Sequence, residues 1–189
     1  MPATVTPSLL HSVKALLKAD ALRMRCLSEV RRLDLPQAYI GAGFLRNAIW
    51  DWLYHKPAPT PLNDVDVVYF CDVPKRYCDK LIEAQLNERM PEVNWQVKNQ
   101  ALMHLVHGHR PYRNCEHAIS YWVERETCVA VQLTQHEEIK VLAPYGLDAN
   151  FAGTISINPR FPRPDVFTQR VKHKGWLTQW PQLACITSA

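Results

Sequence analysis

The sequence predicts an α+β protein with a mixed α/β core. Segments with apolar residues at helical spacing alternate with short β-branched or alternating segments along the first hundred residues. The composition, with 47% hydrophobic and 21% charged residues among 189, is that of a globular chain long enough to bury a core. This composition excludes a disordered chain, collagen and a disulfide-stapled miniprotein, and we expect residues 1–189 to form one domain.

The first segments predict a helical N-terminus followed by a strand, a turn and a helix. Apolar residues recur at helical spacing over 8–33, between two prolines, and form one long helix or two short ones. Residues 37–43 are typical of a short strand that runs into a glycine turn. Residues 44–54 then continue with helical spacing and no breaker.

A stiff loop leads to the next strand. Residues 56–63 contain three prolines, and 64–70 form a β-branched strand. A helix is predicted from Pro74 to about Met90, where Pro91 ends it. Residues 93–98 alternate large apolar with polar side chains, as a half-buried strand does.

The second half of the chain is predicted in shorter pieces. Residues 99–106 and 115–122 are expected to be helical, and 127–133 and 139–142 to form a strand pair. The end of the chain combines a short helix, an extended segment at 154–158 and a basic helical stretch. Most of the net charge of +4 lies there, in Arg160, Arg163, Arg170, Lys172 and Lys174 against Asp165.

Charge and cysteine usage exclude several functional classes. A net charge of +4 permits an anionic ligand such as a nucleotide but is too small to indicate nucleic acid. The six cysteines show no C-x-x-C spacing and the N-terminus has no secretory pattern, so we expect reduced thiols in a cytoplasmic protein. No apolar run approaches the ~20 residues that cross a bilayer, so we expect no membrane partner.

Asp64 and Asp66 form the first candidate site. Two carboxylates at i and i+2 on a strand project from the same face, where they can converge on one hard cation. Mg²⁺ suits this pair because it takes one or two protein carboxylates and completes its shell with water and phosphate oxygens. Taken alone, a D-x-D pair more often only caps a strand.

The glycine turn upstream forms the second candidate site. Gly41 and Gly43 precede a helix, whose free backbone N–H groups and dipole attract an anion, and Arg46 adds a charge in the first turn. A lone G-x-G is usually only a tight turn, and this one lacks the third glycine of a dinucleotide fingerprint. Its position before the aspartate pair makes the combination informative.

The order strand, glycine turn with Arg46, helix, loop and D-x-D strand resembles the DNA polymerase β-like nucleotidyltransferase superfamily, which includes the head of tRNA CCA-adding enzymes. Over nearly the whole chain, the sequence resembles a bacterial family of predicted nucleotidyltransferases. The segments that carry this resemblance are 39–47 (YIGAGFLRN), 61–70 (PLNDVDVVYF), 95–100 (WQVKNQ), 111–112, 120–122 and 143–147.

The resemblance implies a polymerase β-like fold, with a mixed central sheet flanked by helices and the helical segment 1–36 packed on it. Residues 37–100 would form the catalytic motif core, and 101–189 would complete the sheet and end in the basic segment. The implied reaction transfers a nucleoside monophosphate from a nucleoside triphosphate to a hydroxyl or phosphate of an unknown acceptor (RNA, protein or small molecule), releasing pyrophosphate. Mg²⁺ or Mn²⁺ is the expected cofactor, and no zinc is expected.

The resemblance also implies roles for individual residues. Asp64 and Asp66 would hold the metal, while Gly43 and Arg46 would help to hold the triphosphate. Ala42 and Asn47 depart from the CCA-adding pattern, which has Gly and Asp there. Lys98, opposite Trp95 and Val97 by strand alternation, would face the phosphates or be solvated. The expected nucleotide-binding residues are Gly41, Gly43, Arg46, Asn47, Lys98 and Asn99, although Asn99 would alternatively satisfy backbone groups at the strand end.

A third carboxylate is harder to assign. The superfamily supplies it from the strand after the intervening helix, but residues 95–100 contain none. Glu92, Glu124 and Glu126 are the substitutes, and we favour Glu124 as the third catalytic residue beside Asp64 and Asp66. A surface salt bridge is an equally good explanation of Glu124.

Two other classes of function stay open from the sequence. One is a non-catalytic nucleotide- or RNA-binding module that has lost the third carboxylate. The other is an antitoxin-like partner protein. The basic stretch 170–174 would bind the triphosphate tail or an RNA acceptor, or be an ordinary solvated helix face.

Overall fold

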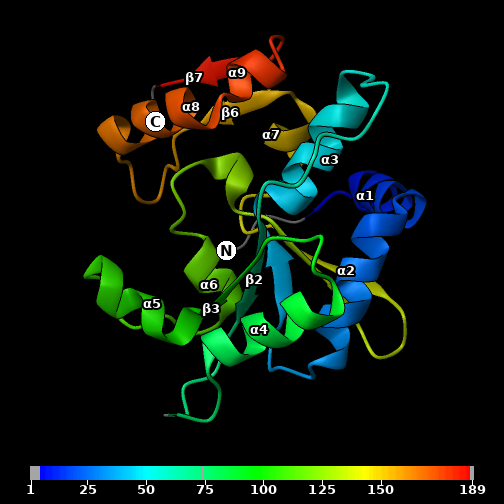
Figure 1. The fold of residues 1–189 in the computed structure, drawn as a ribbon. Coiled ribbons are helices and arrows are strands. Elements are labelled where there is room, and N and C mark those ends of the chain that lie inside the picture. Colours follow the sequence, from blue (N-terminus) through cyan, green and yellow to red (C-terminus); the bar gives the residue numbers. More distant parts are fainter. Residues whose placement is uncertain (1–4, 74, 188–189) are drawn as a thin grey trace.

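A five-stranded mixed sheet forms the centre of the computed structural model, which describes residues 5–73 and 75–187 (Figure 1). The strand order is β3-β2-β1-β4-β5; β2 and β3 are parallel and the other neighbours antiparallel. The predicted mixed sheet is confirmed. The strands are β1 (Tyr39–Gly41), β2 (Val65–Tyr69), β3 (Trp95–Asn99), β4 (Ala130–Leu133) and β5 (Ile139–Leu142).

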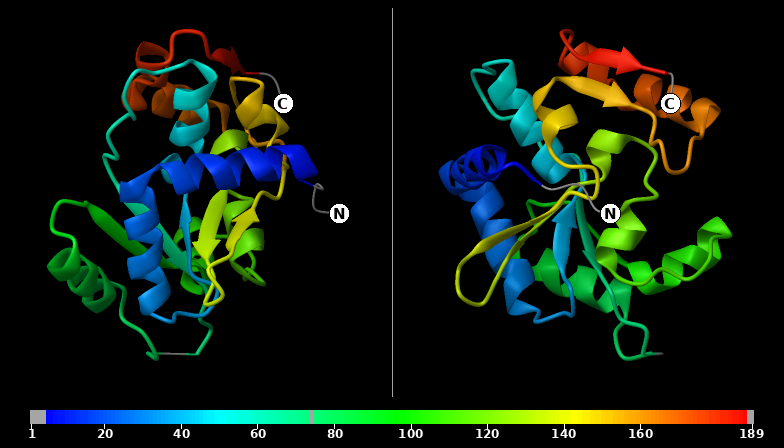
Figure 2. Two further views of the ribbon diagram at one scale, coloured as in Figure 1. Left: turned by 90° about the vertical axis from the view of Figure 1, so that its right-hand side faces the viewer. Right: turned by 180° about the vertical axis from the view of Figure 1, so that it is seen from behind.

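The N-terminal helical segment is two helices, α1 (Pro7–Ala19) and α2 (Ala21–Arg32). The break lies at Asp20, which has extended backbone angles and whose side chain accepts a hydrogen bond from Arg23 N. An aspartate at this position caps the second helix and stabilises its first turn. The two helices lie at a steep angle to each other beside the sheet (Figure 2).

One face of the sheet holds the main apolar core. Strand alternation buries Val65, Val67 and Tyr69 of β2 with Trp95 and Val97 of β3. This core is covered by α1, α2, α3 (Gly43–Leu53) and α4 (Asp79–Arg89). The helix predicted to begin at Pro74 begins at Asp79, and Pro74 itself lies outside the described residues.

The opposite face of the sheet carries the polar residues of β2 and β3. A small cluster of Val68, Ala130, Cys115 and Ile119 packs α6 (Cys115–Ile119) against it. Asp66, Gln96 and Lys98 share this face by alternation. Two boundaries are shorter than predicted. The helix expected over 115–122 ends at 119, and a 3₁₀ turn at Arg125–Thr127 delays the strand expected from 127 to Ala130.

The C-terminal elements form a separate layer, at the top of Figure 1 in yellow to red. A second apolar cluster joins them to α3 through Trp50, Trp176 and Trp180, with Trp50 and Trp180 ring centroids 5.1 Å apart. This packing holds α8 next to the start of α3. The elements are α7 (Asp148–Phe151), β6 (Thr154–Ser156), α8 (Pro164–Lys174), α9 (Trp176–Gln179) and β7 (Ala184–Ile186), the last of which was not predicted.

No described helix combines the length and apolar character that a membrane span needs.

Candidate functional site

Asp64 and Asp66 lie together at the start of β2 and line one small hollow of about 60 Å³, here called the smaller hollow. Burial and the neighbouring charge of Asp64 raise the pKa of Asp66 to about 6. The Oδ2 atom of Asp64 lies 3.7 Å from Nζ of Lys174. Two adjacent carboxylates that repel each other form a donor set that fits a hard divalent cation.

A third carboxylate does not join this pair. Among residues 5–73 and 75–187, no group of three or more His, Cys, Asp and Glu side chains is placed to hold a metal ion. Glu124 is fully buried and bound by Arg170, with Oε1 2.6 Å from Nε and Oε2 3.2 Å from Nη2. Glu126 accepts hydrogen bonds from Ser156 N and Thr154 Oγ1, and Glu92 pairs with Arg25.

The turn before α3 has an unusual backbone. Ala42 adopts φ +55° and ψ −122°, which is a conformation that L-residues rarely occupy, and its N–H donates to Val129 O at 2.9 Å. The turn directs the start of α3 toward the smaller hollow, which Ala42 and Gly43 line. A Cβ on Gly43 would lie 3.3 Å from Nη2 of Arg46, so glycine permits the close approach of that side chain.

Gly41 lies in close contact with Trp122. It is a buried residue of β1, and a Cβ there would lie 2.7 Å from Cη2 of Trp122. Gly41 is among the lining residues of neither hollow described here. Its missing side chain makes room for a tryptophan 81 positions away, a contact that local sequence does not reveal.

Arg46 is a fixed buried cation beside the aspartates. Its Nη1 donates to Thr127 Oγ1 at 2.7 Å and its Nη2 to Asn47 Oδ1 at 2.9 Å. The guanidinium also stacks between the rings of Trp50 and Trp176, at 4.9 and 4.6 Å from their centroids. Burial lowers the pKa of Arg46 to about 10, so the side chain stays charged at neutral pH.

Helix α8 supplies two more cations to the same hollow. Arg170 and Lys174 are one turn apart on its surface, and both line the smaller hollow. The predicted basic stretch therefore lies across from the aspartate pair. The hollow combines the carboxylates of Asp64 and Asp66 with three cations, and this arrangement suits a metal-bound polyphosphate.

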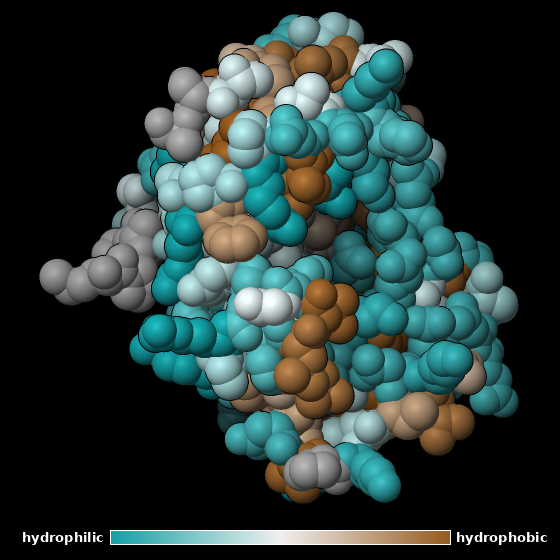
Figure 3. All heavy atoms as spheres, turned by 90° about the vertical axis from the view of Figure 1, so that its left-hand side faces the viewer, coloured by the Kyte–Doolittle hydropathy of each residue, from teal (hydrophilic) through white to brown (hydrophobic). Residues whose placement is uncertain are grey.

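A second, larger hollow of about 410 Å³ adjoins the first and shares Ala42, Asp66, Thr127 and Arg170 with it. Lys98 lines it from the face of β3 opposite Trp95 and Val97, as strand alternation predicts. Figure 3 shows the left-hand side of Figure 1 from outside, where the surface is recessed and apolar side chains gather over α5 (Gln100–His107). Aromatic side chains of Tyr112, Tyr121 and Trp122 also line the hollow.

Asn99 serves the backbone. Its Oδ1 accepts from Cys71 N at 3.0 Å and from Ala101 N at 3.1 Å, and its Nδ2 donates to Cys71 O at 2.7 Å. The side chain therefore caps α5 and joins it to the end of β2. Asn99 lines neither the smaller nor the larger hollow. Its neighbour Gln100 does line the larger hollow.

His107 and His109, which follow β3, line the larger hollow next to aromatic side chains. The ring of His109 lies 4.6 Å from that of Phe161 and 4.9 Å from that of Tyr121, measured between centroids. His109 Nδ1 also contacts Tyr112 Oη. Sequence spacing alone gave no sign of these ring contacts, because Phe161 and Tyr121 come from distant segments.

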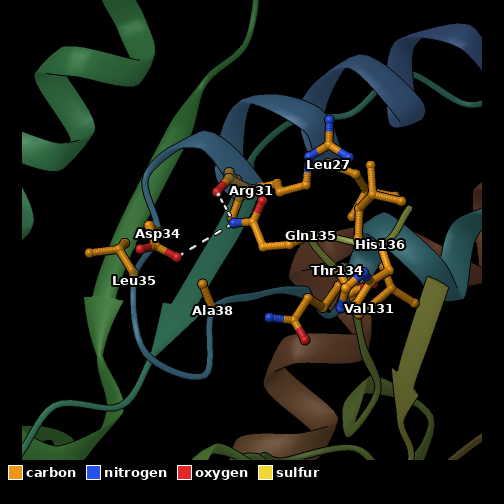
Figure 4. Close-up of a pocket in the computed structure, with 12 residues that line it drawn as sticks. Leu27, Arg31, Asp34, Leu35, Ala38, Val131, Thr134, Gln135 and His136 are labelled. Atoms are coloured by element: carbon orange, nitrogen blue, oxygen red, sulfur yellow. Dashed lines mark hydrogen bonds between the residues drawn. The ribbon is translucent and has the colours of Figure 1, made fainter. Parts of the chain in front are cut away.

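A further pocket of about 320 Å³ lies between α2 and the β4–β5 hairpin (Figure 4). Gln135 Nε2 donates there to Asp34 Oδ1 and Arg31 O, each at 3.4 Å. This pocket shares no lining residue with the two hollows, and the aspartate pair is absent from it. The candidate site is therefore the pair of hollows that meet at Asp66.

Comparison with known proteins agrees with the motif resemblance. A family model described as nucleotidyltransferase matches residues 28–185. A solved structure described as "The NMR structure of the protein reveals a CCA-adding enzyme head domain" is 28% identical, with a TM-score of 0.79, over 91% of this chain and 94% of that one. No curated protein matches in sequence.

Two longer structures share the fold alone. One, "tRNA-processing enzyme (apo form I)", is 11% identical with a TM-score of 0.51, and the match covers 98% of this chain and 45% of that one. The other, "tRNA-processing enzyme (apo form 2)", is 12% identical with a TM-score of 0.50, covering 85% and 44%. This chain matches less than half the length of either protein.

Proposed function

The chain belongs to a nucleotidyltransferase family, and we propose that it transfers a nucleoside monophosphate from a nucleoside triphosphate to an acceptor and releases pyrophosphate. One observation carries the proposal. The Asp64 and Asp66 carboxylates, the start of α3 and the cations Arg46, Arg170 and Lys174 all line one hollow. Nucleotidyl transfer needs such a combination of metal ligands and phosphate-binding groups.

The triphosphate would lie against the start of α3. The first N–H groups of a helix have no partner within it and favour an anion, and the Gly43 backbone is open to close approach. Arg46 is held by Thr127 and two tryptophan rings, so its charge needs no reorganisation when phosphate binds. Arg170 and Lys174 would neutralise the same anion from the side of α8.

Asp64 and Asp66 would hold the metal ion, Mg²⁺ or Mn²⁺. Their side chains fit it because they are adjacent oxygen donors whose mutual repulsion a cation relieves. When bound, the ion supplies positive charge beside the α-phosphate of the nucleotide. The chain itself positions the triphosphate and excludes water from one side through the buried Trp50–Trp176 cluster.

Label transfer tests the proposal. The protein is incubated with each α-labelled triphosphate, Mg²⁺ or Mn²⁺, and separate RNA, protein and small-molecule fractions of a cell extract. We expect one fraction to gain label with the wild type and with Glu88→Gln, which changes an exposed residue on α4. The Asp64→Asn/Asp66→Asn variant should transfer at least a hundredfold less. Equal transfer by that variant would contradict the site assignment.

A second candidate function is nucleotide binding without transfer. The observation that favours it is the pair of carboxylates, which the described residues do not extend to three. A binding module would retain the metal-dependent affinity for triphosphate and leave every acceptor fraction unlabelled. The same experiment therefore separates the two functions.

A further inference from the structure

We infer that the larger hollow binds the acceptor and that the acceptor group is a phosphate monoester. This inference rests on the proposed nucleotidyl transfer and names the class of its second substrate. The larger hollow meets the smaller one at Asp66, so a group bound there adjoins the proposed triphosphate site.

The charges of the larger hollow point to an anion. Lys98, Arg163 and Arg170 line it, and Asp66 at its border is the sole carboxylate among its described lining residues. The Nε atom of Arg163 is buried and has no hydrogen-bond partner in the described chain. Three cations around the larger hollow, of which Arg163 has an unpaired N–H donor among the described residues, are a set suited to phosphate.

The strand beside Asp66 offers no base for a hydroxyl acceptor. In the parallel register of β2 and β3, Asp66 lies opposite Gln96 and Val68 opposite Lys98. An amide accepts no proton at neutral pH, and a lysine ammonium offers hydrogen-bond donors but no acceptor. The buried carboxylate of Glu124 accepts hydrogen bonds from Arg170 through both of its oxygens.

Two histidines, His107 and His109, also line the hollow, beside Asp66 and the phenols of Tyr112 and Tyr121. Burial and the charge of Arg163 lower the pKa of His107, and burial with the charges of His107 and Arg163 lowers that of His109. A lowered pKa makes an imidazole a weaker proton acceptor, and His109 is also engaged by Tyr112. Asp66, the one carboxylate among the described lining residues, is assigned to the metal ion, so a hydroxyl bound here would have no free carboxylate to accept its proton.

A phosphate monoester needs no such help because it is already an anion at neutral pH. One of its oxygens forms the new bond to the α-phosphorus of the triphosphate. The bond from that phosphorus to the oxygen bridging to the β-phosphate breaks, and the electron pair leaves with pyrophosphate. The product is a nucleoside joined to the acceptor through a diphosphate, and Lys98 and Arg163 offset the repulsion between the two anions.

The rest of the acceptor faces an apolar wall. Tyr112, Tyr121, Trp122 and Met103 line the hollow beside the cations. Aromatic side chains bind rings and other flat apolar groups. The volume of about 410 Å³ lies in the range of small-molecule sites, so we expect a small monoester that carries a ring.

Binding is tested first, without catalysis. Calorimetry with phenyl phosphate and with phenol as probes is run on the wild type, Lys98→Gln, Lys98→Arg and Lys140→Gln. Lys140 is the matched control, because it is an exposed strand lysine outside both hollows. We expect phenol to bind at least tenfold more weakly than phenyl phosphate. Lys98→Gln should bind phenyl phosphate at least tenfold more weakly than the wild type, while Lys98→Arg and Lys140→Gln should stay within threefold of it. Equal affinity of the wild type for phenyl phosphate and phenol overturns the inference, and so does an unchanged affinity of Lys98→Gln for phenyl phosphate.

Transfer is tested second, with labelled triphosphate, Mg²⁺ and matched acceptors that differ by one phosphate, such as ribose and ribose 5-phosphate. We expect label on the phosphorylated members alone, in a diphosphate linkage. Label on the acceptors that carry only hydroxyl groups, or on dephosphorylated RNA or protein, overturns the inference. Such a result would still support nucleotidyl transfer as the function. If the wild type shows no metal-dependent binding of any triphosphate, the proposed function is overturned, and the inference with it.

Discussion

Arg170 and Glu124 form a bidentate ion pair, with Nε 2.6 Å from Oε1 and Nη2 3.2 Å from Oε2. The carboxylate is fully buried, whereas the Arg170 side chain is 36% exposed and reaches both hollows. Glu124 therefore fixes the position of a cation at the junction of the two hollows.

Breaking this pair from the Arg170 side should be costly. Arg170→Gln leaves the Glu124 carboxylate buried without its cation, and we expect a loss of about 2–3 kcal/mol in the free energy of unfolding. The double variant Glu124→Gln/Arg170→Gln removes the buried charge as well and should recover at least half of that loss. Urea unfolding gives the free energies of unfolding of Arg170→Gln, Glu124→Gln and the double variant. A double-variant loss equal to the sum of the two single-variant losses would contradict a coupled pair.

Ala42→Gly should stabilise the protein. Ala42 has φ +55° and ψ −122°, where a Cβ is strained and glycine is not. We expect a gain of about 1 kcal/mol by thermal or urea unfolding, partly offset by the greater entropy of the unfolded chain. Ala84→Gly, an exposed position within α4, is the control and should cost about 1 kcal/mol. A loss of stability in Ala42→Gly would refute the strained turn.

Gly41→Ala should displace Trp122. The new Cβ would lie 2.7 Å from Cη2 of that ring, which is closer than van der Waals contact allows. We expect a loss of about 1–3 kcal/mol from overpacking and a change in tryptophan fluorescence. Gly108→Ala is the comparison, because no atom lies within 4 Å of its Cβ position, so any loss there comes from its φ of +67° and not from a close contact. Unchanged fluorescence in Gly41→Ala would show that the contact is absent.

The pH dependence of stability should report Asp66. Burial and Asp64 raise the pKa of Asp66 to about 6 in the native state, compared with about 3.9 in an unfolded chain. The native state then holds the proton more tightly over this window, so wild-type stability falls as pH rises from about 4 to 6.

Asp66→Asn removes this titration. We expect a flatter profile between pH 4 and 6 and a gain on the order of 2 kcal/mol at pH 7, measured by urea unfolding with a chelator present. Glu88→Gln should follow the wild-type profile. Coincident profiles for Asp66→Asn and the wild type would show that the native carboxylate titrates normally.

Local signals in the sequence predict the elements around the candidate site. The glycine turn into α3, the proline-rich loop and the Asp64–Asp66 spacing are all contained in short segments. The structure accordingly places Gly43, Arg46, Asp64 and Asp66 in one hollow. The predicted family and fold are confirmed by the family match and the shared head-domain fold.

Long-range contacts explain what the sequence could not predict. Glu124 meets an arginine 46 positions later, and Gly41 is a glycine because of Trp122. Asn99 is used by the Cys71 backbone, a partner that appears only when β2 and β3 are aligned. Strand β7 is three residues long and exposed, so it has no apolar periodicity to reveal it.

The metal-dependent binding of a nucleoside triphosphate tests the central claim most directly. Melting temperatures are measured with each triphosphate, with and without Mg²⁺, for the wild type and for Asp64→Ala/Asp66→Ala. At about 100 times the dissociation constant, a ligand adds about 2.7 kcal/mol, or roughly 5–10 °C for a chain of this size. We predict a shift of that order with Mg²⁺ in the wild type, and loss of its metal-dependent part in the double variant. An equal metal-dependent shift in the double variant would contradict a site built on Asp64 and Asp66.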